Sequence, residues 1–128
     1  MNPKNYKYSK THEWIRIEGK IAVVGLTQFA ATQLGDVVFL QPPEPGTETQ
    51  KGKGIGVVES VKTVSDIYAP VSGKVVKKNS NLENSPELVN QDPFGKGWIA
   101  EIEMFDPSEA DDLLSAEAYE EHCAQAGH

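Results

Sequence analysis

Short apolar runs interrupted by glycine and proline make up most of this chain, and within several of them apolar and polar residues alternate. Alternation with a period of two is typical of half-buried β-strands. Residues 14–17 and 20–24 predict a first hairpin, with its turn at residues 18–19. Residues 98–104 alternate most clearly, and one face of that strand would carry Trp98, Ala100, Ile102 and Met104. The pattern therefore predicts a turn-rich β protein.

Helical patterns occur at two places. Thr27 can cap a short helix, and Gly35 can end it in the left-handed conformation that glycine favours. Phe29 and Leu34 would supply the apolar contacts of this helix. After Pro107, apolar residues recur at helical spacing with acidic residues opposite, and they predict one short and one longer helix covering a face of the sheets. The apolar residues of these terminal helices are Leu113, Leu114, Ala118, Tyr119 and Cys123.

The remaining segments read as strands and loops. Residues 37–40 predict a buried strand, and the proline-rich segment 42–46 cannot continue it, because proline donates no ladder hydrogen bond. Residues 70–73 predict a turn into a short strand at 74–78. Residues 79–97 are rich in Asn, Pro and Gly, and we expect a long ordered loop there.

Gly52, Gly54 and Gly56 alternate along the chain in a way that superficially suggests a nucleotide site. No helical pattern follows them, so they would not form an anion site at a helix amino terminus. Close crossing of strands in a small barrel is the better interpretation.

The segment 58–67 reads almost the same in both directions around Lys62. A two-residue turn at Lys62 and Thr63 would pair Val61 with Val64, Ser60 with Ser65, Glu59 with Asp66, and Val58 with Ile67. Opposed carboxylates cost about 0.2–1 kcal/mol, and Lys-Thr is a poor turn sequence. Such local conflicts favour a functional lysine presented at the hairpin tip. The alternative is an ordinary solvated lysine.

Composition narrows the classes of function. A length of 128 residues fits one domain, and a formal charge of −7 disfavours nucleic acids and anionic membranes as partners. With one cysteine, Cys123, a disulfide framework and a cysteine metal site are excluded, and a reducing compartment is the simplest setting. We expect no bound metal. Residues 1–10 lack a secretory signal pattern, and no apolar run approaches membrane-spanning length.

A lysine at a hairpin tip in a small acidic β-domain resembles the biotinyl and lipoyl carrier domains. Biotin carriers have methionine on both sides of the lysine, whereas here the neighbours are Val61 and Thr63. Residues 56–62, which end in Glu-Ser-Val-Lys, resemble the H proteins of the glycine cleavage system, and residues 65–73 extend the likeness. Further matching stretches are residues 11–14, 33–39 and 86–98. The similarity covers residues 6 to 123.

The resemblance agrees with the fold that the pattern predicts. We expect a mainly β (α+β) protein, a flattened barrel-sandwich hybrid of two small antiparallel sheets with a short internal helix and C-terminal helices. Residues 1–128 would form a single lipoyl-carrier domain. Its parts would be an N-terminal extension at 1–10, a β core at 11–104 and the C-terminal helices at 107–124.

The resemblance also implies a function as a carrier and not as an enzyme. Lipoate would be joined in amide linkage to Lys62. The arm would accept an aminomethyl group from a pyridoxal-phosphate glycine decarboxylase and present it to a tetrahydrofolate-dependent aminomethyltransferase. A dihydrolipoyl dehydrogenase would then reoxidise the arm. Lipoate-attaching enzymes are the other implied partners, and we expect a monomer in the bacterial cytoplasm, or in the mitochondrial matrix if a transit peptide has been removed.

Several residues receive roles from these arguments. Glu59 and Asp66, with Ser60 and Ser65 beside them, would mark the site for the attaching enzyme and orient the arm. Thr11 and Glu13 match positions that line the cleft for the loaded arm in relatives. The alternative for Glu59 and Asp66 is that both are solvated strand residues. For Thr11 the alternative is a polar strand start, and His12 is interpreted in that way. Thr63 and Phe29 depart from the usual family residues, alanine and a polar or histidine side chain.

Two other functions stay open at this point. One is a lipoate relay protein of the same fold, which donates lipoate to other enzymes and has lost glycine cleavage. The other is a β-domain that carries no cofactor, in which Lys62 is only a surface residue. Activity with glycine decarboxylase separates the first from glycine cleavage, and the intact mass of the native protein tests the second.

Overall fold

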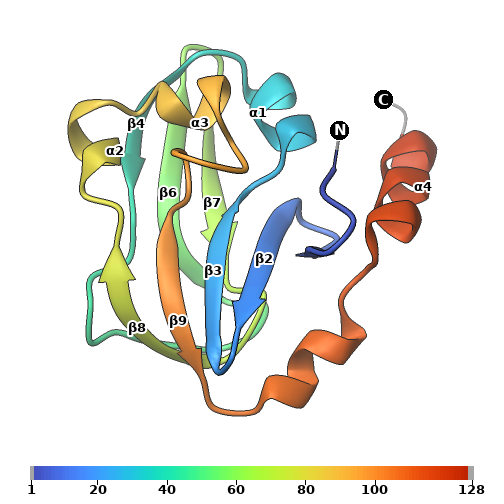
Figure 1. The fold of residues 1–128 in the computed structure, drawn as a ribbon. Helices are drawn as coiled ribbons and strands as arrows, with labels where there is room; N and C mark the ends of the chain where they lie inside the picture. The colour runs from blue at the N-terminus through green and yellow to red at the C-terminus, as the bar shows by residue number, and fades with distance from the viewer. Residues whose placement is uncertain (1, 127–128) are drawn as a thin grey trace.

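The computed structural model describes residues 2–126, and over this range nine strands form two antiparallel sheets with short helices around them (Figure 1). The larger sheet has the order β1 (Lys7–Tyr8), β2 (Glu13–Glu18), β3 (Ile21–Leu26), β9 (Ala100–Met104), β8 (Gly73–Lys78) and β5 (Glu48–Thr49). The smaller sheet has the order β4 (Val37–Gln41), β6 (Gly54–Ser60) and β7 (Val64–Tyr68). The predicted mainly β fold with two antiparallel sheets is confirmed.

The helices are α1 (Gln28–Leu34), α2 (Asn81–Asn84), α3 (Leu88–Gln91), a 3-10 helix (Pro107–Asp112) and α4 (Ala116–Ala126). The ends of α1 are those predicted. Thr27 Oγ1 accepts a hydrogen bond from the Ala30 N–H at 3.2 Å, and Gly35 has φ +77°. Helix α4 lies beside the N-terminal segment (Figure 1), where the Tyr119 ring stacks on Tyr8 with centroids 4.9 Å apart. No helix within residues 2–126 is long and apolar enough to cross a membrane.

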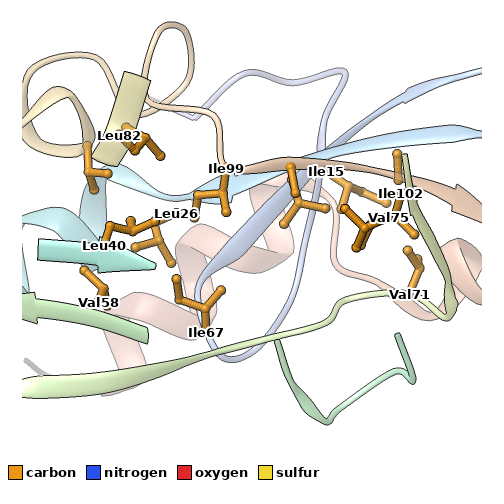
Figure 2. Close-up of a cluster of buried hydrophobic side chains, with 14 of the residues drawn as sticks. Ile15, Leu26, Leu40, Val58, Ile67, Val71, Val75, Leu82, Ile99 and Ile102 are labelled. Carbon is orange, nitrogen blue, oxygen red and sulfur yellow. The ribbon is translucent and has the colours of Figure 1, made fainter. Parts of the chain in front are cut away.

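Two apolar clusters hold the elements together, and strand β2 contributes to both. Ile15 lies in the main cluster between the sheets, together with Leu40, Val58 and Ile102 (Figure 2). Its neighbour Trp14 points to the opposite face of β2 and joins a second cluster, which contains Tyr8, Val23, Ala116 and Tyr119. Because successive side chains of a strand point to opposite faces, β2 is buried on both sides where α4, the N-terminal segment and the loop around Phe94 cover its second face.

The register predicted for the central hairpin was wrong. Glu59 pairs with Val64 and Asp66 pairs with Val57, so the two carboxylates do not oppose each other. Instead of a two-residue turn, residues 60–63 form a wider tip. Ser60 Oγ accepts the N–H groups of Lys62 and Thr63 at 3.1 and 3.2 Å, and the Ser60 N–H donates to the Thr63 carbonyl at 2.8 Å. The Ser60 hydroxyl thus supplies the turn chemistry that Lys-Thr lacks.

Several boundaries also differ from the prediction. The larger sheet begins at β1, inside the segment expected to be an extension, and the first hairpin turns at residues 19–20 instead of 18–19. The expected loop 79–97 contains the one-turn helices α2 and α3. Strand β4 is not fully buried, because a bulge between Val37 and Phe39 leaves Val38 and Phe39 exposed.

The close strand crossing predicted from three glycines is found at one of them. A Cβ on Gly56 would lie 2.4 Å from the carbonyl oxygen of Gln41 on β4. Gly54 and Gly52 have open space around them, so the prediction was wrong for these two. Gly52 instead has φ +87°, which a turn requires.

Candidate functional site

Lys62 lies at the exposed tip between β6 and β7, as predicted. Its aliphatic stem runs along the turn that follows α1, because a Cβ placed on Gly35 would lie 3.0 Å from Lys62 Cε. The Val61 N–H donates to the Asp36 carbonyl at 3.0 Å and joins the tip to the same turn. Among residues 2–126, no carboxylate forms an ion pair with Lys62. The backbone around this lysine is fixed, and its amine is accessible.

A cleft of ≈ 390 Å³ opens next to this turn. It lies between α1, the turn before β2 and the β6–β7 hairpin, and its lining residues are Thr11, His12, Glu13, Leu26, Phe29, Ala30, Gln33, Leu34, Val58, Ser65 and Asp66. Four of the predicted site residues, Thr11, Glu13, Ser65 and Asp66, therefore come together at the cleft. Glu59 lies outside it on the exposed side of β6, and Ser60 is buried inside the tip.

Glu13 is buried in the wall of the cleft, with 1% of its surface exposed. Its Oε1 accepts hydrogen bonds from Ser9 Oγ at 2.5 Å and from Thr11 Oγ1, and its Oε2 accepts one from the Tyr68 N–H at 3.2 Å. Burial raises the pKa of Glu13, while these hydrogen bonds work in the opposite direction. The carboxylate joins the turn before β2 to the end of β7 and so fixes two sides of the cleft.

His12 connects the cleft to the C-terminal helix. It lies in the turn before β2 with φ +75°, and not in a strand as predicted. Its Nδ1 is 2.7 Å from the Tyr119 hydroxyl, which is also 2.7 Å from Thr27 Oγ1. The His12 ring packs against Phe29 with centroids 4.7 Å apart. Helix α4 is thereby bonded to the residue that caps α1, the helix that forms one wall of the cleft.

The environment of His12 predicts a pH dependence of stability. Burial, and secondarily the nearby His122, lower the pKa of His12 from 6.5. The unfolded state therefore takes up a proton more readily, and the free energy of unfolding falls as the pH drops below about 6.5. His12→Asn, which tolerates the positive φ, is expected to show a smaller fall between pH 7 and 5 in urea titrations. Identical slopes for the two proteins would contradict this assignment.

The sequence did not single out the α1 side of the cleft. Phe29 and Ala30 both lie on the same side of α1 as Gln33, because residues three and four positions apart are neighbours on a helix surface. This helical spacing was the available signal. Phe29 differs from the polar or histidine residue usual in the family. In this protein it packs against the His12 ring and gives the cleft an apolar wall.

Two small antiparallel sheets, an exposed lysine on a hairpin tip and a narrow cleft beside it define a carrier domain of the lipoyl and biotinyl class. The model of the family described as "Glycine cleavage H-protein" matches residues 6–126. The chain belongs to this family. It is accordingly a lipoyl carrier component of the glycine cleavage system and not itself the catalyst.

Individual relatives agree with this assignment. The glycine cleavage system H protein of Symbiobacterium thermophilum is 60% identical over 118 residues, which cover 92% of each chain. That of Thermotoga maritima is 52% identical and covers 95% of this chain and 98% of the relative. The crystal structure of a glycine cleavage system H protein from Mycobacterium marinum superimposes with a TM-score of 0.86 at 37% identity, covering 99% of this chain and 100% of the other.

Proposed function

We propose that Lys62 bears lipoate in amide linkage and carries the aminomethyl group of glycine from a pyridoxal-phosphate glycine decarboxylase to a tetrahydrofolate-dependent aminomethyltransferase. A dihydrolipoyl dehydrogenase then restores the disulfide. The observation that carries the proposal is the accessible Lys62 amine, whose stem runs along Gly35, the residue that follows the cleft residue Leu34. We place the protein in the cytoplasm as a monomer. The bacterial relatives support that compartment.

The cleft fits such an arm. When bound, lipoate supplies a disulfide that can accept an aminomethyl group together with two electrons, which is chemistry that a lone cysteine cannot perform. Leu26, Leu34 and Val58 offer an apolar lining to an aliphatic chain. The exposed carboxylate of Asp66 lies at the same cleft and could pair with a cationic amine. We infer that Asp66 and Ser65 hold the loaded end, while Glu13 and Thr11 shape the wall that keeps water away.

A tethered arm suits a protein with several clients. An arm fixed to a rigid hairpin raises the effective concentration of its reactive end at each active site without tight binding to any of them. The tip hydrogen bonds of Ser60 and the Val61–Asp36 bond supply that rigidity. We therefore assign Ser60 a supporting function in the tip.

The intact mass of protein purified from a host that makes lipoic acid tests the proposal. We expect the mass to exceed that of the sequence by one lipoyl group, and peptide mapping to place the increment on Lys62. A protein that stays unmodified in such a host, even with an active attaching enzyme, would refute the carrier function. Modification without turnover by glycine decarboxylase would favour a lipoate relay instead.

Glu59→Gln tests whether the exposed carboxylate three residues before the lysine is recognised during attachment. We expect the rate of lipoate attachment to fall several-fold while the free energy of unfolding changes by less than about 0.5 kcal/mol, because the side chain is exposed. Glu121→Gln, an exposed acid on α4, serves as the matched control. Equal attachment rates for both variants and the parent would remove Glu59 from the recognition site.

A further inference from the structure

Apolar side chains gather around the lysine on the outside of the smaller sheet. Among the residues that the structure describes, the large hydrophobic side chains with high exposure are Ile17, Val38, Phe39, Val61, Val64, Val76 and Phe105. Four of these, Val38, Phe39, Val61 and Val64, belong to the tip or to the strands beside it, and we call them the tip patch. They are 52%, 47%, 67% and 62% exposed, respectively. Clustered exposed apolar residues of this kind mark interaction sites.

The strands place these residues together. Phe39 on β4 pairs with Glu59 on β6, and Glu59 pairs with Val64 on β7, so the three side chains form one row across the sheet. The bulge between Val37 and Phe39 leaves Val38 exposed as well as Phe39. A regular strand would have turned one of two adjacent residues toward the core.

The tip patch is separate from the cleft. Val58 and Ser65, which form the next pair along β6 and β7, line the cleft, whereas none of the four patch residues does. Successive residues of a strand point to opposite faces. Near the tip, Val58 and Ser65 therefore face the cleft and the row with Val64 faces away from it, while Asp66, further along β7, also reaches the cleft.

Acidic groups border the patch. Glu59 lies within the row, and the exposed Asp36 is joined to the tip through the bond from the Val61 N–H to its carbonyl. The whole chain has a formal charge of −7. A complementary partner surface is therefore apolar in its centre and basic at its rim.

We propose that the tip patch is the docking face for the enzyme that joins lipoate to Lys62. The proposal rests on the proposed function of Lys62, and the chemistry selects the partner. The enzymes that use the loaded arm bind its reactive end, which lies a full arm length from the lysine. The attaching enzyme, by contrast, must bring its active site to Nζ itself and must cover the side chains around the tip.

The attachment step requires this approach. Nζ loses its extra proton and attacks the carbonyl carbon of an activated lipoyl carboxyl group. The C–N bond forms while the bond from that carbon to the leaving group breaks, and a second proton passes to solvent. No electron is transferred. Because the nucleophile is the lysine amine, the enzyme surface around the reacting carbonyl comes to lie against Val61 and Val64.

A pair of double variants tests the proposal with the full-length chain. Phe39→Ser with Val64→Thr removes apolar surface from the patch, and Phe105→Ser with Val76→Thr removes similar surface elsewhere. With a purified lipoate ligase, lipoate and ATP, we expect the patch variant to lose at least about tenfold in kcat/KM, mainly through KM, and the control to stay within about twofold. After complete loading at high ligase concentration, both variants are expected to turn over with glycine decarboxylase at the parent rate.

The outcomes separate this inference from the proposed function. The ligase is first shown to be active on another lipoyl domain. If it then leaves the parent protein unmodified, the proposed function is refuted. If the parent is modified and lipoate is attached to the patch and control variants at equal rates, only the proposed docking face is refuted. If the patch variant lost the same factor in the rate of lipoate attachment and in the rate of turnover with glycine decarboxylase, the proposal would also be refuted. The patch would then contact the enzymes that use the loaded arm as well as the attaching enzyme. A parent dimer that the patch variant converts to a monomer in sedimentation velocity would show a self-interface instead.

Discussion

Lys62→Arg is expected to abolish the carrier function while leaving the fold intact. Arginine keeps the positive charge and an aliphatic stem, so the contact with Gly35 is retained and the free energy of unfolding is expected to change by less than about 0.5 kcal/mol. The guanidinium group stays protonated in proteins, with a pKa above about 12, so it cannot replace the amine as a nucleophile. Intact mass is expected to show no lipoyl increment, and glycine-dependent exchange of carbon dioxide is expected to fall to the level without carrier.

Lys74→Arg is the matched control, because Lys74 is an exposed lysine on β8, away from the tip. It is expected to be lipoylated and active like the parent. A lipoyl increment retained in Lys62→Arg would place the arm on another residue and would overturn the assignment.

Gly56→Ala is expected to destabilise the protein by about 3 kcal/mol. The added methyl group would lie 2.4 Å from the Gln41 carbonyl oxygen, which belongs to the backbone of the neighbouring strand β4. Side-chain rotation cannot relieve this overlap, so β4 and β6 must move apart and weaken their hydrogen bonds. Thermal and urea unfolding would measure the loss.

Gly54→Ala, two residues earlier on the same strand, separates the effect of close approach from the effect of losing a glycine. Its Cβ meets no atom within 4 Å. Because alanine restricts the unfolded chain, this variant is expected to be neutral or more stable by up to about 1 kcal/mol. A similar loss of stability in both variants would show that backbone freedom, and not strand contact, is what Gly56 provides.

Features set by neighbouring residues could be predicted from the sequence. The cap of α1 by Thr27 and its end at Gly35 follow from local hydrogen bonding and local backbone geometry. The strand predicted at 98–104 begins only at Ala100, and its alternation matches the buried face of Ala100, Ile102 and Met104, whereas Trp98 joins the second cluster. The exposed Lys62 follows from the two β-branched runs around it, and the family resemblance drew attention to the same residue.

Features set by distant residues could not be predicted in this way. The near-palindrome around Lys62 suggested the wrong register. The distant part of the cause is the bond from Val61 to the Asp36 carbonyl, and the local part is the Ser60 hydroxyl, whose turn bonds pairing by residue type does not reveal. The burial of Glu13 depends on the Tyr68 N–H, 55 residues away. The bulge that exposes Val38 depends on how β4 meets β6 and has no local sequence signal.

The bond between the Tyr119 hydroxyl and Thr27 joins residues 92 positions apart in the chain. During synthesis on the ribosome, the lysine hairpin and α1 emerge well before the residue that completes this wall of the cleft. The cleft that we propose for the loaded arm is therefore one of the last features to form. A nascent chain can therefore expose Lys62 before the cleft beside it is complete.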